Sequence, residues 1–125
     1  MNFDDAMASH IIWKLRLTRF INGSGGEDFD RGTVGNNEAC DLGKWIFREG
    51  AKYQGTTAYG GLLKKHADFH RCAAEVIGKV DTGDRAGARA IIDGPFEEAS
   101  RGIIIALAEL RQQVAVTEVK ARLTA

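Results

Sequence analysis

Apolar residues recur at three- and four-residue steps through the long stretches of this 125-residue chain, and clusters of glycine interrupt those stretches. This spacing places apolar side chains on one face of a helix, whereas a half-buried strand would alternate apolar and polar residues. The sequence shows no such alternation and no repeat of fixed period. It therefore predicts an all-α fold, a four- to five-helix bundle that forms a single domain over residues 1–125.

Glycine clusters and capping residues divide the chain into predicted helices. Five are expected, over residues 3–21, 38 to about 48, 57 to about 80, 85–92 and 95 to about 122. Residues 22–37 contain five glycines and little that could enter a core, so we expect a mobile loop there. Asp93-Gly94-Pro95 is expected to end the fourth helix and to begin the fifth, because proline suits a first helical turn.

The middle of the last predicted helix is apolar on nearly every side, because Ile103, Ile104 and Ile105 are consecutive. One apolar face can pack in the core of the bundle, but a second needs another partner. We therefore expect a homodimer that buries this second face. The alternative is a helix surrounded by its own bundle.

The charge balance argues against two classes of partner. Lysine and arginine total 17 and so do aspartate and glutamate, so no net field attracts nucleic acid or anionic lipid. The longest apolar run, IIIAL at 103–107, is far shorter than the roughly 18 residues of a membrane span. The acidic start MNFDDAM does not resemble a secretory signal. We expect a cytoplasmic protein with reduced cysteines, bound to neither nucleic acid nor membrane.

All three histidines of the chain lie on inward faces of predicted helices. His66 and His70 are four residues apart, which places their β-carbons roughly 5 to 6 Å apart on one face. Such a pair is often part of an ordinary core, but His10 and Cys40 add a third imidazole and a thiolate on inward faces. A His₃Cys set suits tetrahedral Zn²⁺. The predicted metal ligands are therefore His10, Cys40, His66 and His70.

Several neighbours fit a buried metal. Gly43 follows Cys40 by three residues, where a missing side chain would let another helix approach the metal, although a packing glycine explains it equally well. Trp13 and Trp45 are expected to wall off the site or to pack in the core. Cys72 lies about 200° around the helix from His70, so we expect a small core residue. Three acidic residues could orient the imidazoles, although solvated helix charges are the simpler explanation: Glu38, Asp41 and Asp68.

Three motifs carry a resemblance to a known family. His10-Ile11-Ile12-Trp13, Cys40-Asp41-Leu42-Gly43-Lys44-Trp45 and His66-Ala67-Asp68-Phe69-His70 resemble the H-x-x-W, C-x-L-G-x-W and H-x-x-x-H signature of the chemoreceptor zinc-binding (CZB) domain family. The resemblance implies a bacterial cytoplasmic helical bundle that binds zinc through three histidines and one cysteine. Such domains are regulatory, are attached to soluble chemoreceptors and diguanylate cyclases, often dimerise, and are linked to sensing of zinc and of oxidants such as hypochlorous acid.

This resemblance implies a sensor that acts on a chemotaxis or cyclic-di-GMP partner, either as a free-standing member or as a piece of a longer signalling protein. We expect oxidation of Cys40 to remove one ligand and to free the short second helix. The alternative is a helical dimerisation or interaction module whose zinc is purely structural.

Other activities fit the sequence less well. We expect no enzyme, because Ala67 follows His66 where a zinc hydrolase of the H-E-x-x-H type has its catalytic glutamate. Phosphotransfer would need an exposed histidine, whereas all three are predicted to face inward. The glycine-rich loop lacks a G-K-[ST] motif and a preceding strand, which argues against a nucleotide site.

Overall fold

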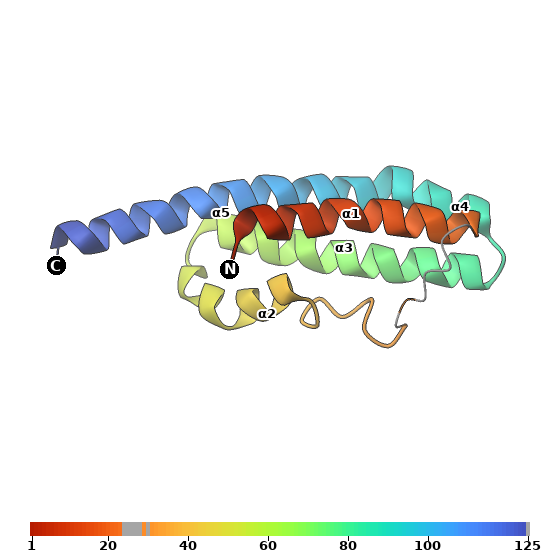
Figure 1. Ribbon diagram of the computed structural model, residues 1–125, viewed down its shortest axis with the longest axis horizontal. Helices are drawn as coiled ribbons and strands as arrows, with labels where there is room; N and C mark the ends of the chain where they lie inside the picture. Colours follow the sequence, from red (N-terminus) through yellow and green to blue (C-terminus); the bar gives the residue numbers. More distant parts are fainter. Residues whose placement is uncertain (24–28, 30, 125) are drawn as a thin grey trace.

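The computed structural model describes residues 1–23, 29 and 31–124, and within them every regular element is helical. Three long helices run side by side (Figure 1): α1 (Phe3–Asn22), α3 (Thr57–Asp81) and α5 (Glu97–Thr124). The shorter elements are α2 (Asp41–Phe47), the 3₁₀ turn η1 (Glu49–Tyr53), α4 (Arg85–Ile91) and the π-helical turn η2 (Ile92–Phe96). The predicted all-α bundle is confirmed.

Local capping explains where the long helices begin and end. The Asn2 side chain accepts a hydrogen bond from the Asp5 amide at 3.1 Å, and Gly23 ends α1 in the left-handed region at φ 70°. The Thr56 hydroxyl accepts from the Tyr59 amide at 3.1 Å and so begins α3. These bounds of α1 and α3 agree with the predicted ones to within one residue.

The core lies between α1, α3 and α5. Phe69 of α3 packs against Phe96 with ring centroids 4.7 Å apart. Each fully buried large side chain contributes about 1.5 to 3 kcal/mol relative to its exposed state. Those with no exposed surface include Leu17, Ile46, Leu62, Phe69, Val76, Phe96, Ile103, Leu107 and Leu110.

The predicted break at residues 93–95 was wrong, because α4, η2 and α5 follow one another without a gap. Pro95 has no amide hydrogen to donate to the helix, and the chain widens into a π turn around it instead of stopping. Ile92 and Phe96 on either side of this turn are both buried. Their burial holds the turn against the bundle despite the missing hydrogen bond.

The expectation that residues 22–37 contribute little to the core was also wrong. Phe29 and Val34 are buried, at 4% and 6% exposure. Phe29 stacks on Trp13 at 5.5 Å and meets Phe20 edge to face at 5.4 Å. The predicted mobility concerned this loop, of which residues 24–28 and 30 lie outside the described part of the chain.

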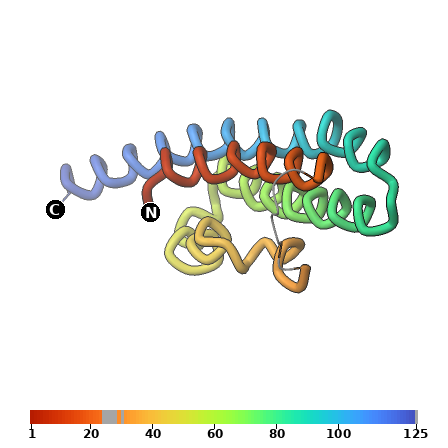
Figure 2. The backbone as a smooth tube through the Cα atoms, turned by 45° about the vertical axis from the view of Figure 1, so that its right-hand side comes forward, coloured from red at the N-terminus to blue at the C-terminus, as the bar shows by residue number. Residues whose placement is uncertain are grey.

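One side of α5 faces the bundle and the other faces solvent. Ile103 is fully buried, whereas Ile105 is 60% exposed. The C-terminal end of α5 also projects beyond the other helices, past the start of α1 (Figures 1 and 2). Within the residues described, no helix is both long and apolar enough to cross a membrane.

Candidate metal centre

Four side chains from three elements converge between α1, α3 and the start of α2. His10 comes from α1, His66 and His70 from α3, and Cys40 from the residue preceding α2. One ligand atom of each lies within 4.8 Å of the others. The three histidines are at most 2% exposed, and Cys40 is half-buried. All four predicted site residues are therefore brought together in the structure.

The separations suit a tetrahedral ion. The Cys40 sulfur lies 3.2 Å from Nε2 of His66, which in turn lies 3.1 Å from Nε2 of His70. Bonds of about 2.0 to 2.1 Å to nitrogen and 2.3 Å to sulfur place neighbouring ligand atoms roughly 3.3 to 3.6 Å apart around zinc. These two separations would need to lengthen by only a few tenths of an ångström for the ion to fit.

Backbone carbonyls orient two of the imidazoles. The His10 Nδ1 atom donates to the Ala6 carbonyl at 2.7 Å, and the His70 Nδ1 atom donates to the Val34 carbonyl at 3.0 Å. Because a carbonyl can only accept, both Nδ1 atoms carry the hydrogen and both Nε2 atoms present a lone pair to the cluster.

The acidic residues considered as orienting groups do not supply these contacts. Asp68 instead pairs with Lys64 at 3.0 Å and with Arg71 at 3.1 Å on the surface. Sequence reasoning missed both carbonyls. The Ala6 carbonyl has a weak signal, since it lies four residues before His10 on the same helix, but nothing in the sequence indicates Val34.

Two buried nitrogens of the cluster have no hydrogen-bond partner among the described residues: His10 Nε2 and His66 Nδ1. A buried polar atom left unpaired costs about 1 to 3 kcal/mol. A metal ion at the cluster would satisfy His10 Nε2, whereas His66 Nδ1 lies on the far side of its ring from the cluster. The donor set and the orphaned His10 nitrogen both fit a bound zinc ion.

Burial keeps the imidazoles in the form that binds metal. Desolvation, with smaller contributions from the neighbouring His70 and His10, lowers the pKa of His66 to about 3. Desolvation also lowers the pKa of His10 and that of His70, although their carbonyl partners oppose the shift. Neutral imidazole is the metal-binding species, so these three side chains are ready to coordinate at neutral pH.

Cys40 is an N-cap and does not lie within a helix, which corrects the prediction that α2 begins near residue 38. Its backbone is extended, at φ −81° and ψ 163°, and its sulfur accepts a hydrogen bond from the Gly43 amide at 3.3 Å. Burial raises the pKa of the Cys40 thiol, and the Gly43 and Leu42 amides partly oppose this rise. Zinc binding would therefore displace a proton from the sulfur.

Gly43 permits a close approach, but the approaching group is not another helix. A β-carbon at this position would lie 1.8 Å from the Asn37 carbonyl oxygen and 3.0 Å from the Glu38 α-carbon. The turn that precedes α2 thus packs directly on the backbone of its first turn. This contact fixes where Cys40 stands relative to the histidines.

Gly43→Ala should therefore destabilise the protein by about 1 to 3 kcal/mol, because the new methyl group meets backbone atoms that cannot move alone. Gly78→Ala is the matched control, since a β-carbon there meets nothing within 4 Å on the exposed side of α3. That substitution should stabilise by about 0.4 to 1 kcal/mol. Urea denaturation of the metal-free proteins measures both. Equal effects would contradict the close contact at Gly43.

The remaining neighbours divide between site and core. Trp13 lies 5.9 Å from the His70 ring and forms part of the wall, as predicted. Trp45 packs on Phe3 at 5.8 Å and on Tyr53 at 6.3 Å, which agrees with the core-packing alternative given for it. Cys72 is buried in the core and is not one of the four clustered residues, as expected.

Comparison with known families supports the same interpretation. The family model for the chemoreceptor zinc-binding domain matches residues 10–77, which is more than half of the chain and includes all four clustered residues. Searches of curated proteins and of solved structures found no match.

Proposed function

Because this chain belongs to the chemoreceptor zinc-binding domain family, we propose that it is a regulatory zinc-sensing domain with His10, Cys40, His66 and His70 as ligands. The observation that carries this proposal is the convergence of the four ligand atoms within 4.8 Å in a buried site. Residues 1–125 act as one domain, since the site joins α1, α2 and α3 while α5 packs along α3. The family is regulatory, and the domain performs no catalysis of its own.

The four ligands differ in how firmly the fold holds them. His66 and His70 lie on the 25-residue α3, whereas Cys40 precedes the seven-residue α2. Zinc, when bound, holds the sulfur as thiolate and supplies the charge that binds it. Cys40 is thus the ligand next to the shortest of the three helices at the site.

Oxidation of Cys40 is the proposed signal. The Cys40 thiolate transfers two electrons to hypochlorous acid, giving a sulfenic acid and chloride, so that sulfur gains the oxygen and loses its negative charge. The neutral sulfenic acid is a poor zinc ligand. Release of Cys40 then loosens the turn before α2, and a chemotaxis or cyclic-di-GMP signalling protein reads this change.

Amide exchange should rise in residues 38–48 after the zinc-loaded protein is treated with one equivalent of hypochlorous acid. A Cys72→Ala background leaves Cys40 as the one cysteine of the chain, and mass spectrometry verifies which residue is modified. Exchange in the buried half of α3 should stay unchanged. Undiminished protection at 38–48 after verified oxidation would leave a purely structural zinc site as the better interpretation.

A second role, as a dimerisation module, is favoured by an exposed apolar face. Ile11 and Leu15 of α1 are 57% and 52% exposed, and Ile11 lines the same groove as Ile105 of α5. A groove of about 360 Å³ lies between these helices, and its lining combines isoleucines with polar and charged residues: Ile11, Lys14, Glu97, Ser100, Arg101, Ile104 and Ile105. We propose that a second copy of the chain covers this face. A symmetric dimer pairs the same surface of both copies, and this surface carries both exposed apolar side chains and a groove that could receive them.

Ile105→Glu should convert the dimer to a monomer, because it replaces the exposed apolar surface of Ile105 with a charge inside the proposed interface. Analytical ultracentrifugation measures the change, and circular dichroism should show unchanged helix content. Leu123→Glu is the matched control, since Leu123 is 80% exposed on the projecting end of α5, away from the groove. A wild-type monomer at all concentrations, or equal dissociation by both variants, would refute this interface.

A further inference from the structure

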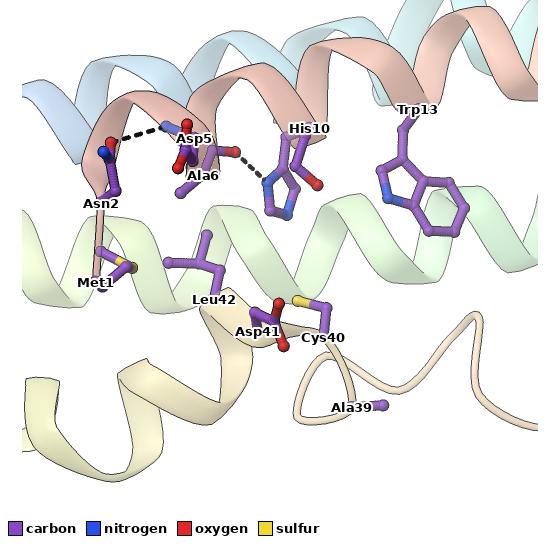
Figure 3. A pocket seen from close by; sticks show the side chains of 11 residues that line it. Met1, Asn2, Asp5, Ala6, His10, Trp13, Ala39, Cys40, Asp41 and Leu42 are labelled. Carbon is purple, nitrogen blue, oxygen red and sulfur yellow. Dashed lines mark hydrogen bonds between the residues drawn. The ribbon is translucent and has the colours of Figure 1, made fainter.

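Cys40 lines two separate cavities. The larger, of about 530 Å³, lies between the first half of α1 and the start of α2, and its lining includes Asn2, Asp5, His10, Cys40 and Asp41 (Figure 3). The smaller, of about 220 Å³, is lined by Arg16, Thr33, Cys40 and His70. Each cavity thus reaches two of the four clustered residues.

The two cavities differ in charge. Asp5 and Asp41 line the larger one, and no lysine or arginine side chain of the described chain does so. Arg16 lines the smaller one, where its guanidinium covers the Trp13 ring at 4.6 Å and the Phe29 ring at 4.8 Å. A divalent cation that approaches Cys40 through the larger cavity is attracted by the two carboxylates.

A buried nitrogen without a hydrogen-bond partner in the described part of the chain belongs to a residue that lines the larger cavity. His10 is only 2% exposed, its Nε2 atom has no hydrogen-bond partner in the described structure, and its ring points from α1 toward Cys40 (Figure 3). A cation that passes through this cavity therefore meets an available nitrogen and then the sulfur. His66, in contrast, is fully buried and lines neither cavity.

We propose that the larger cavity is the route by which zinc enters and leaves the site, and that Asp5 and Asp41 accelerate capture of the ion. The proposal rests on the ligand set given under the proposed function. Asp5 and Asp41 are exposed and do not belong to the clustered four, so they attract the approaching ion without being among its ligands. The effect is electrostatic and falls with ionic strength.

Stopped-flow mixing of metal-free protein with zinc tests this route, with tryptophan fluorescence as the signal because Trp13 lies 5.9 Å from the His70 ring. The double variant Asp5→Asn/Asp41→Asn should lower the association rate constant about three- to tenfold at roughly 10 mM salt, where charge attraction reaches about 30 Å. The difference should shrink at about 1 M salt, where the screening length is about 3 Å.

Two matched variants decide where the charge acts. Glu75→Gln/Asp93→Asn makes the same change of net charge outside both cavities and should leave the association rate within twofold of wild type. Arg16→Gln, in the smaller cavity, should leave it unchanged or slightly raised. Equal slowing by both acidic pairs, or acceleration by Arg16→Gln as large as the slowing by the Asp5/Asp41 pair, would overturn the proposed route.

The dissociation rate of zinc distinguishes failure of the proposed entry route from failure of the ligand assignment. If the Asp5→Asn/Asp41→Asn variant lost as much zinc affinity, through faster dissociation, as a variant of one of the clustered residues, these carboxylates would be ligands. The entry role would then be refuted. If wild-type protein bound no zinc at all, the ligand set itself would fail. Zinc uptake at equal rates by wild type and the Asp5/Asp41 variant would refute the route alone.

Discussion

Replacing Cys40 with alanine should weaken zinc binding by about a thousandfold or more, whereas Cys72→Ala should change it by no more than about twofold. Structural zinc sites bind with about 10 to 16 kcal/mol shared among four ligands, so loss of the thiolate removes several kcal/mol. Cys40 lies 3.2 Å from His66 Nε2, while Cys72 is buried in the core and outside the cluster. Competition with a zinc chelator of known affinity measures both variants.

Cys40→Ser distinguishes the loss of zinc binding from the loss of the N-cap of α2. Cys40 is both a clustered residue and the N-cap of α2, so alanine removes two contributions together. Serine is a preferred N-cap, and its hydroxyl can still accept the Gly43 amide hydrogen. We expect metal-free Cys40→Ser to match the metal-free wild type in urea denaturation and yet to bind zinc nearly as weakly as Cys40→Ala. Equal zinc affinity for the Cys40 and Cys72 variants would contradict the ligand assignment.

The parts of the site that depend on local periodicity could be predicted from the sequence. His66 and His70 are one helical turn apart, so any helix through them places both rings on one face, and α3 does so. His10 follows the same logic on α1, where it lies on the same buried side as Leu17 and Ile21. Helical spacing thus indicates three of the four clustered residues without any knowledge of tertiary packing.

The parts that depend on tertiary contacts could not be predicted. The start of α2 was misplaced because cysteine is not among the preferred N-caps, so nothing local marks Cys40 as the residue before the helix. The Val34 carbonyl reaches His70 across 36 positions of sequence, and a backbone atom leaves no signal in residue identity. The π turn at Pro95 was missed because burial of Phe96 outweighs the usual effect of proline on a helix.

Removing zinc should lower the midpoint of thermal unfolding by at least about 10 °C. Zinc at about a thousand times its dissociation constant stabilises the folded state by about 4 kcal/mol, and each kcal/mol shifts the midpoint of a domain of this size by roughly 3 to 6 °C. Without the ion, His10 Nε2 stays buried without a partner, and the lowered pKa values show that the buried imidazoles resist protonation. Calorimetry before and after chelation, with metal content by mass spectrometry, measures the shift and should find about one zinc per chain.

His66→Leu is the control that ties this shift to the cluster. His66 has no exposed surface and carries an unpartnered Nδ1, so leucine removes a buried polar group as well as a ligand. Its metal-free midpoint should therefore lie within a few degrees of the metal-free wild type, while added zinc should no longer raise it. If the wild-type protein carried no metal and its unfolding midpoint did not change when zinc was added, the cluster would be three core histidines beside a thiol and not a zinc site. A zinc-dependent rise that persists in His66→Leu would place the bound ion elsewhere in the chain.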